Sequence, residues 1–124
     1  MGDQKFLIEC KSKLLEIKKD LLSRQLQMKT QFADFTKSGD ETDLAVAQIE
    51  EDAFLLQQNR FRTQLFEIES ALARIEKNDY GICEETGEPI EKARLLALPH
   101  TRLSIEGAEI REKFQKRFLK FASI

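Results

Sequence analysis

The chain has 124 residues, of which 34% are charged and 41% are hydrophobic, and its 20 Lys and Arg nearly balance its 22 Asp and Glu. This length is typical of one domain, and the apolar content is too high for a disordered chain. The net charge of −2 argues against general nucleic-acid binding, which needs excess cations to neutralise phosphates.

The sequence predicts a cytoplasmic protein without a membrane segment. Its longest uninterrupted apolar run, residues 95–99, is too short to cross a bilayer, and residues 1–5 contain no apolar signal core. Cys10 and Cys83 are the only cysteines, which excludes a disulfide framework and favours a reducing compartment.

Two long segments without Gly or Pro predict a pair of amphipathic helices. The first, about residues 4–35, places apolar side chains at spacings typical of a coiled-coil seam: Leu7, Cys10, Leu14, Ile17, Leu21, Met28 and Phe35. The second, about residues 44–78, repeats the pattern: Phe54, Phe61, Leu65, Ile68, Leu72 and Ile75. Because residues 37–40 form a short connection, we expect an antiparallel hairpin about 45 Å long.

The connection between these helices is acidic. Residues 38–59 contain six Asp and Glu and no Lys or Arg. If the second helix starts near Asp40, the carboxylates of Asp40 and Asp43 share one side of its first turn. From the spacing alone, helix capping explains the pair better than a function does, and both can hold together. Two carboxylates are too few to hold Ca²⁺ or Mg²⁺ alone, so a functional tip needs a partner.

The remaining residues predict a small module. Residues 79–91 are rich in turn formers and indicate a compact β-hairpin. Residues 104–122 predict a last helix with five basic and three acidic residues, which is either a solvated amphipathic face or a docking surface for an acidic partner.

Several of these residues resemble the DksA/TraR family of bacterial RNA polymerase regulators. The zinc-finger module of that family is matched by residues 80–83, Gly87, Ile90, residues 94–95 and Pro99. Residues 40–45 match its tip motif, Asp-x-x-Asp-x-Ala. The resemblance implies a mainly α fold: a long coiled-coil hairpin over residues 1–78 with its tip near residues 38–45, then a finger-like module and C-terminal helix over residues 79–124.

The match departs from the family at the metal site. The positions of its four zinc-binding cysteines hold Cys83, Thr86, Ser104 and Gly107. One thiolate cannot hold tetrahedral zinc, and the lone histidine, His100, is expected to be an ordinary loop residue. We therefore expect no metal or other cofactor. Packing on the final helix should hold the module together, through Tyr80, Ile82, Ile90, Leu95, Leu96, Leu98, Leu103 and Ile105.

By resemblance, the protein binds RNA polymerase and inserts its coiled-coil tip into the secondary channel, where it modulates transcription initiation without reading DNA sequence. The resemblance assigns the tip function to Asp40, Asp43 and Ala45. Asp40 and Asp43 would offer charge or hydrogen-bond acceptors, and the small Ala45 would permit close approach.

The resemblance also concerns the nucleotide ppGpp, which relatives bind through basic residues. The matching positions here hold Glu67, Leu98 and Ala108, while Arg60 keeps a suitable charge and is a candidate polymerase contact. Since such an anion needs several Arg or Lys donors, we expect ppGpp dependence to be weak or absent. We also expect a monomer.

Two other readings remain. A Gre-like transcript-cleavage factor also carries an acidic coiled-coil tip, but it has a larger globular domain after the hairpin. A structural or adaptor coiled coil would self-associate through the seam, which the breaks at Gly39 and residues 81–99 disfavour. The sequence has no motif of a self-contained enzyme, so we do not expect one.

Overall fold

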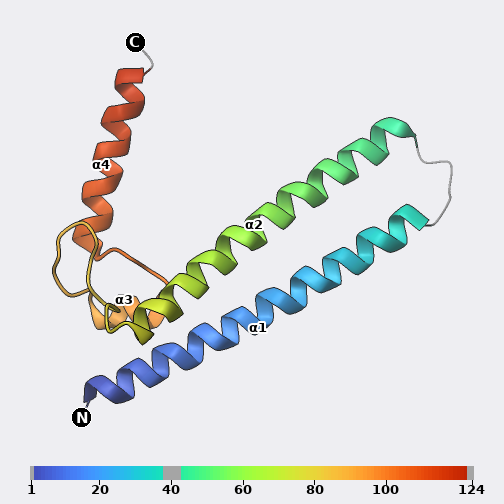
Figure 1. Ribbon diagram of the computed structural model, residues 1–124. Coiled ribbons are helices and arrows are strands. Elements are labelled where there is room, and N and C mark those ends of the chain that lie inside the picture. The colour runs from blue at the N-terminus through green and yellow to red at the C-terminus, as the bar shows by residue number, and fades with distance from the viewer. Residues whose placement is uncertain (1, 38–42, 123–124) are drawn as a thin grey trace. The chain divides into compact units, whose positions relative to one another are not determined.

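The computed structural model describes residues 2–37 and 43–122, and this part of the chain is mainly helical (Figure 1). It contains α1 (Gly2–Lys37), α2 (Leu44–Glu76), α3 (Lys92–Ala97) and α4 (Ile105–Ala122), with no strand among the described residues. The predicted fold class is confirmed. None of the described helices is both long enough and apolar enough to cross a membrane.

The chain divides into two compact units. The hairpin unit is Leu15–Glu69, and the finger unit combines Met1–Leu14 with Ser70–Ile124. The finger unit thus includes the first turns of α1 and the end of α2, so its bounds differ from a division at residue 78. That division stays a prediction from the sequence.

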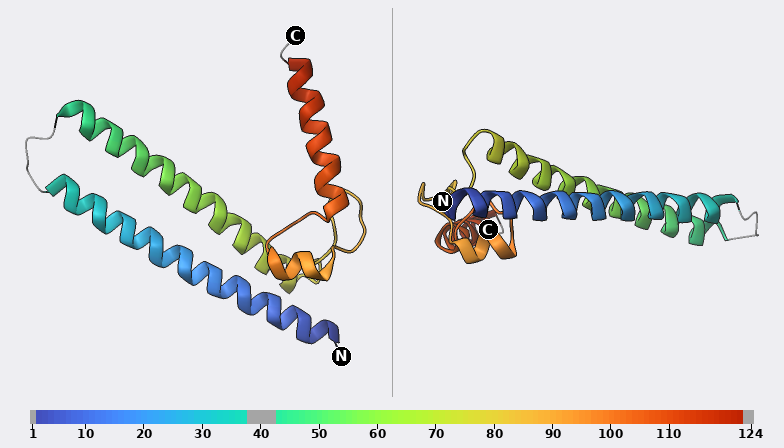
Figure 2. Two further views of the ribbon diagram at one scale, coloured as in Figure 1. Left: turned by 180° about the vertical axis from the view of Figure 1, so that it is seen from behind. Right: turned by 90° about the horizontal axis from the view of Figure 1, so that it is seen from below.

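In the hairpin unit, α1 and α2 run antiparallel (Figure 2). Three contacts fix the register: Lys18 forms an ion pair with Glu69 at 3.6 Å, the Gln25 and Gln58 amides are hydrogen-bonded at 3.2 Å, and the Phe32 and Phe54 rings stack. Residues further along α1 therefore contact residues nearer the N-terminus of α2. Leu21, Phe61 and Ile68 are buried along the seam. Their burial follows the predicted apolar spacing.

The finger unit has its own small core. Cys10, Cys83, Ile90 and Leu95 are buried together, and partly buried side chains surround them: Phe6, Tyr80, Leu96 and Leu103. The Tyr80 hydroxyl donates a hydrogen bond of 2.7 Å to the carbonyl of Pro99. Because Phe6 and Cys10 lie on α1, the module packs on the first helix of the chain.

The predicted packing on the last helix was therefore wrong in part. Ile82, Leu98 and Ile105 are exposed, and α4 contributes only Gly107 to the buried residues. Apolar side chains along α4 are instead solvent-exposed in the described chain: Ile110, Phe114, Phe118, Leu119 and Phe121. The amphipathic pattern predicted the helix correctly but not that its apolar face would be exposed in the described chain.

The predicted β-hairpin is a tight turn with a single antiparallel bridge between Ile82 and Pro89. The Cys83 amide donates to the Glu88 carbonyl at 2.8 Å, and the Ile90 amide donates to the Gly81 carbonyl at 2.7 Å. The two bonds flank the Ile82–Pro89 pair, so the bridge does not use the amide hydrogen that Pro89 lacks. The chain path is thus that of a hairpin, while the two strands are absent from this segment. The short helix α3 was not predicted.

Candidate functional site

The described part of the tip shows how α2 begins. The Asp43 carboxylate accepts a hydrogen bond of 3.2 Å from the Ala45 amide, and the Asp43 carbonyl accepts one of 3.0 Å from the Ala47 amide. Asp43 is therefore the N-cap of α2, which begins at Leu44 as the apolar pattern over about residues 44–78 predicted, so the alternative start near Asp40 does not apply. Asp40 lies outside the described residues.

The start of α2 is exposed, with an acidic N-cap and further acidic residues beyond its first turn. Asp43 and Ala45 are both solvent-exposed, as is the large side chain of Leu44. From residue 43 to residue 59 the chain has four acidic residues and no Lys or Arg. Because the N-terminus of a helix favours negative charge within about its first turn, the Asp43 carboxylate suits the N-cap, whereas the acidic residues at 50–52 lie further along α2. Arg60 follows at once, exposed on α2.

The second candidate region is the metal site of the resemblance. The structure brings Cys83, Thr86, Ser104 and Gly107 together. The Ser104 hydroxyl caps α4 by accepting a hydrogen bond of 3.0 Å from the Gly107 amide, and the Cys83 carbonyl accepts one of 2.9 Å from the Gly87 amide. Cys83 is 1% exposed. These positions therefore enclose a buried thiol.

The thiol of Cys83 has an unusual environment. Burial raises its pKa, but hydrogen bonds from the side chains and backbone amides of Ser104 and Thr86 outweigh that effect and lower the pKa to about 6. These donors stabilise the thiolate in the way that a metal would in a cysteine-rich site.

The residues present do not fit zinc. A structural zinc site needs four ligands, and Cys83 is the only strong one in this set. A Cβ atom on Gly107 would overlap the Cys83 sulfur, so the thiol fills the space at that corner. Among the described residues, no group of three or more His, Cys, Asp or Glu could hold a metal ion.

A network of ion pairs joins the turn after Cys83 to neighbouring segments. Arg111 of α4 contacts Glu85 at 3.0 Å and Glu84 at 3.5 Å, and Arg102 contacts Glu84 at 3.1 Å. These pairs hold the turn against the start of α4, a task that a metal performs in a zinc finger. Sequence reasoning missed them because Glu84 and Arg111 are far apart along the chain.

The folded chain is a helical hairpin with a small finger-like module, and comparisons with known proteins identify its class. The sequence model of the prokaryotic dksA/traR C4-type zinc finger matches residues 78–113. A Caulobacter vibrioides protein named RNA polymerase-binding transcription factor DksA is 35% identical over 107 residues, covering 86% of this chain and 75% of that protein.

Two further comparisons agree. An uncharacterised protein of Aquifex aeolicus is 35% identical over 111 residues, covering 86% of this chain and 77% of that protein. The solved structure of the transcription factor DksA2 from Pseudomonas aeruginosa superposes with a TM-score of 0.85 at 33% identity, covering 92% of this chain and 88% of that one. The chain belongs to the DksA/TraR family.

Proposed function

We propose that this protein is a transcription regulator that binds RNA polymerase and inserts the tip of its hairpin into the secondary channel to modulate initiation. The observation that carries the proposal is the 35% identity over 107 residues to a protein named RNA polymerase-binding transcription factor. The match spans both the hairpin and the finger module, so it includes the parts that such a regulator needs.

The geometry of the hairpin supports this action. Helices α1 and α2 have 36 and 33 residues, which correspond to about 50 Å each, a length that can reach into a channel. The exposed Asp43 and Ala45 stand at the start of α2, and Asp40 completes the proposed tip. We propose that the two carboxylates offer charge or hydrogen-bond acceptors to polymerase residues, and that Arg60 is a further contact.

Other features of the proposal follow from composition and the metal site. The protein acts without zinc, as a cytoplasmic monomer that does not read DNA sequence, and it has no catalytic activity of its own. The effect of ppGpp is weak or absent, because Glu67, Leu98 and Ala108 supply no cation where relatives carry basic residues. The family membership favours this function over a Gre-like cleavage factor or an adaptor coiled coil.

Copurification and transcription assays test the proposal. Tagged protein should retain bacterial RNA polymerase and change transcript yield at a subset of promoters, and an Asp40/Asp43 double variant should lose the effect on yield. Failure of the wild-type protein to bind polymerase would overturn the proposal. Cleavage of RNA in backtracked complexes would point instead to a Gre-like factor, and a ppGpp titration would detect any synergy.

A further inference from the structure

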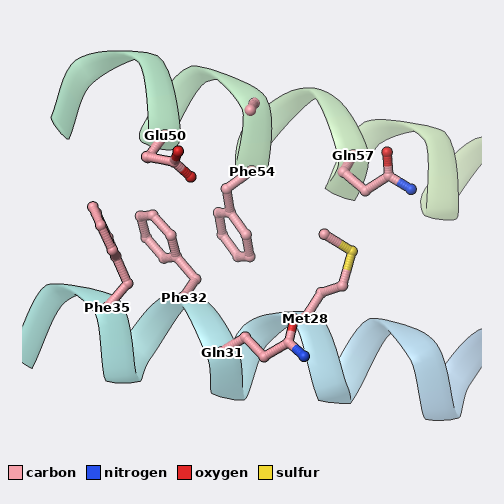
Figure 3. Close-up of a pocket in the computed structure, with 8 residues that line it drawn as sticks. Met28, Gln31, Phe32, Phe35, Glu50, Phe54 and Gln57 are labelled. Carbon is pink, nitrogen blue, oxygen red and sulfur yellow. The ribbon is translucent and has the colours of Figure 1, made fainter. Parts of the chain in front are cut away.

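A cavity of about 310 Å³ lies between α1 and α2 within the hairpin unit (Figure 3). Phe32 and Phe35 of α1 line it with Phe54 and Glu50 of α2, and Met28 closes its other end. Its volume is at the lower end of the range for ligand pockets, so it suits one side chain with its flanking groups. The proposed function assigns no role to this cavity.

The three rings are unevenly spaced. Phe32 and Phe54 are in direct contact, with ring centroids 4.2 Å apart and planes inclined by 5°. Phe32 and Phe35 are nearly parallel as well, inclined by 26°, but their centroids are 6.4 Å apart. If a flat group lay between two parallel rings and touched both, the rings would be about 7 Å apart, twice the usual van der Waals distance. Phe35 is 36% exposed, and its ring already lies within about 1 Å of that separation from Phe32.

The negative charge around the cavity favours a cationic ligand over an anionic one. Glu50 points from α2 toward the rings of Phe32 and Phe35 (Figure 3), and it has no hydrogen bond or ion pair with another described residue. Within residues 28–37 and 43–57, five acidic residues outnumber Lys29 and Lys37. A phosphate or carboxylate ligand would therefore be repelled, while a cation would be attracted both to Glu50 and to the faces of the rings.

Among cations, a guanidinium fits best. It is planar and delocalised, it stacks on aromatic faces, and it pairs with a carboxylate through two parallel hydrogen bonds. A Lys ammonium is a compact and strongly hydrated charge that gains less from parallel rings. We propose that this cavity receives an arginine side chain of RNA polymerase, with the guanidinium between Phe35 and Phe32 and paired with Glu50. This inference rests on the proposed function and identifies a second contact below the tip.

A binding experiment on the isolated protein tests the chemistry. Arginine amide is titrated into the labelled protein while amide chemical shifts are recorded, and we expect saturable shifts confined to the turns around Phe32, Phe35 and Glu50. Lysine amide should bind at least about threefold more weakly, and the Glu50→Gln variant should lose most of the affinity for arginine amide. The Glu51→Gln variant is the matched control, since Glu51 is an exposed neighbour on the same helix that does not line the cavity. Equal binding by the two variants, equal binding of the two amides, or no saturable shift would overturn the proposal.

A second experiment uses the complex. Glu50→Gln should weaken polymerase binding about tenfold, the loss expected for one charge-assisted pair, whereas Glu51→Gln should change it less than about twofold. Phe35→Leu, which keeps an apolar side chain but removes the ring, should resemble Glu50→Gln. If the wild-type protein binds polymerase and all three variants bind as it does, the cavity proposal fails while the proposed function stands. If the wild-type protein does not bind polymerase, the proposed function itself fails.

Discussion

The sulfur of Cys83 lies in the space that a side chain on Gly107 would occupy. A Cβ atom built on Gly107 would overlap that sulfur and would also lie 3.3 Å from Cβ of Glu85 and 3.4 Å from Oγ of Ser104. Two positions that the resemblance matches to zinc ligands are thus joined here by direct packing. The absence of a side chain at one position allows the thiol of the other to be buried.

This contact predicts that Gly107→Ala destabilises the protein. Gly to Ala inside a helix is ordinarily stabilising by about 0.5–1 kcal/mol, so propensity alone would predict a gain. Overlap with the buried sulfur should instead produce a loss of about 1–3 kcal/mol in the free energy of unfolding, measured by urea denaturation.

A double-mutant cycle provides the control for that result. In the Cys83→Ala background the sulfur is absent, so Gly107→Ala should become neutral or stabilising. The same loss in both backgrounds would show that the Cys83 sulfur is not the cause.

The hydrogen bonds to Cys83 predict a dependence of stability on pH. The pKa of this thiol is lowered from its usual value of 9.0 to about 6 in the folded protein. The folded state therefore binds fewer protons between those values, and the free energy of unfolding should rise from pH 6 to pH 9. The contribution of Cys83 is fully present above the usual pKa and is lost as the pH falls through the folded pKa.

Titration of the thiolate by ultraviolet absorbance, as the difference between wild type and Cys83→Ala, should show a midpoint near pH 6. Ser104→Ala removes a donor to the thiolate and should raise that midpoint. A wild-type midpoint near 9.0 would contradict the proposed role of these hydrogen bonds.

Apolar spacing was sufficient to predict the long helices. Leu21 and Phe61 are buried as the seam required, because a period close to that of the helix places them on one face. The same pattern could not show that Phe35 borders a cavity. That depends on which α2 residues lie opposite, and the register is set by contacts between distant residues such as Gln25 and Gln58.

The finger unit was less predictable for a related reason. The order of turn residues gave the path of the chain, and the resemblance gave the positions of Cys83 and Ser104. Neither could show that Ile82 and Leu98 are exposed while Cys10 joins the core, because burial there depends on packing against the start of α1. The location of the tip carboxylates still rests on the sequence, since only Asp43 lies among the described residues.

We predict that the ion pairs of Arg111, and not a metal, hold the turn after Cys83 in place. Arg111→Gln removes contacts to both Glu84 and Glu85 and should lower the free energy of unfolding modestly, because the network is partly exposed, but by more than the control below. Lys116→Gln is the control, since it removes one exposed pair with Glu112 inside α4 and should cost less than about 0.5 kcal/mol.

The same samples test the absence of zinc. A metal chelator should leave the melting temperature of wild type unchanged, and metal analysis of protein purified without chelator should find no stoichiometric zinc. A large drop in melting temperature with chelator would show that the finger unit is stabilised by a metal.

The cap at the start of α2 allows the charge of the tip to be separated from its fold. In Asp43→Asn the amide oxygen can still accept the hydrogen bond from the Ala45 amide, so helix stability should change by less than about 0.5 kcal/mol. Asp43→Ala loses that acceptor and should cost about 1 kcal/mol.

If the carboxylate acts on polymerase, both variants should bind the enzyme within about twofold of wild type yet lose at least about tenfold of their effect on transcript yield. Asp79→Asn, an exposed change of equal charge in the turn after α2, should retain the effect. Full activity of Asp43→Asn with reduced activity of Asp43→Ala would instead assign the residue to capping alone.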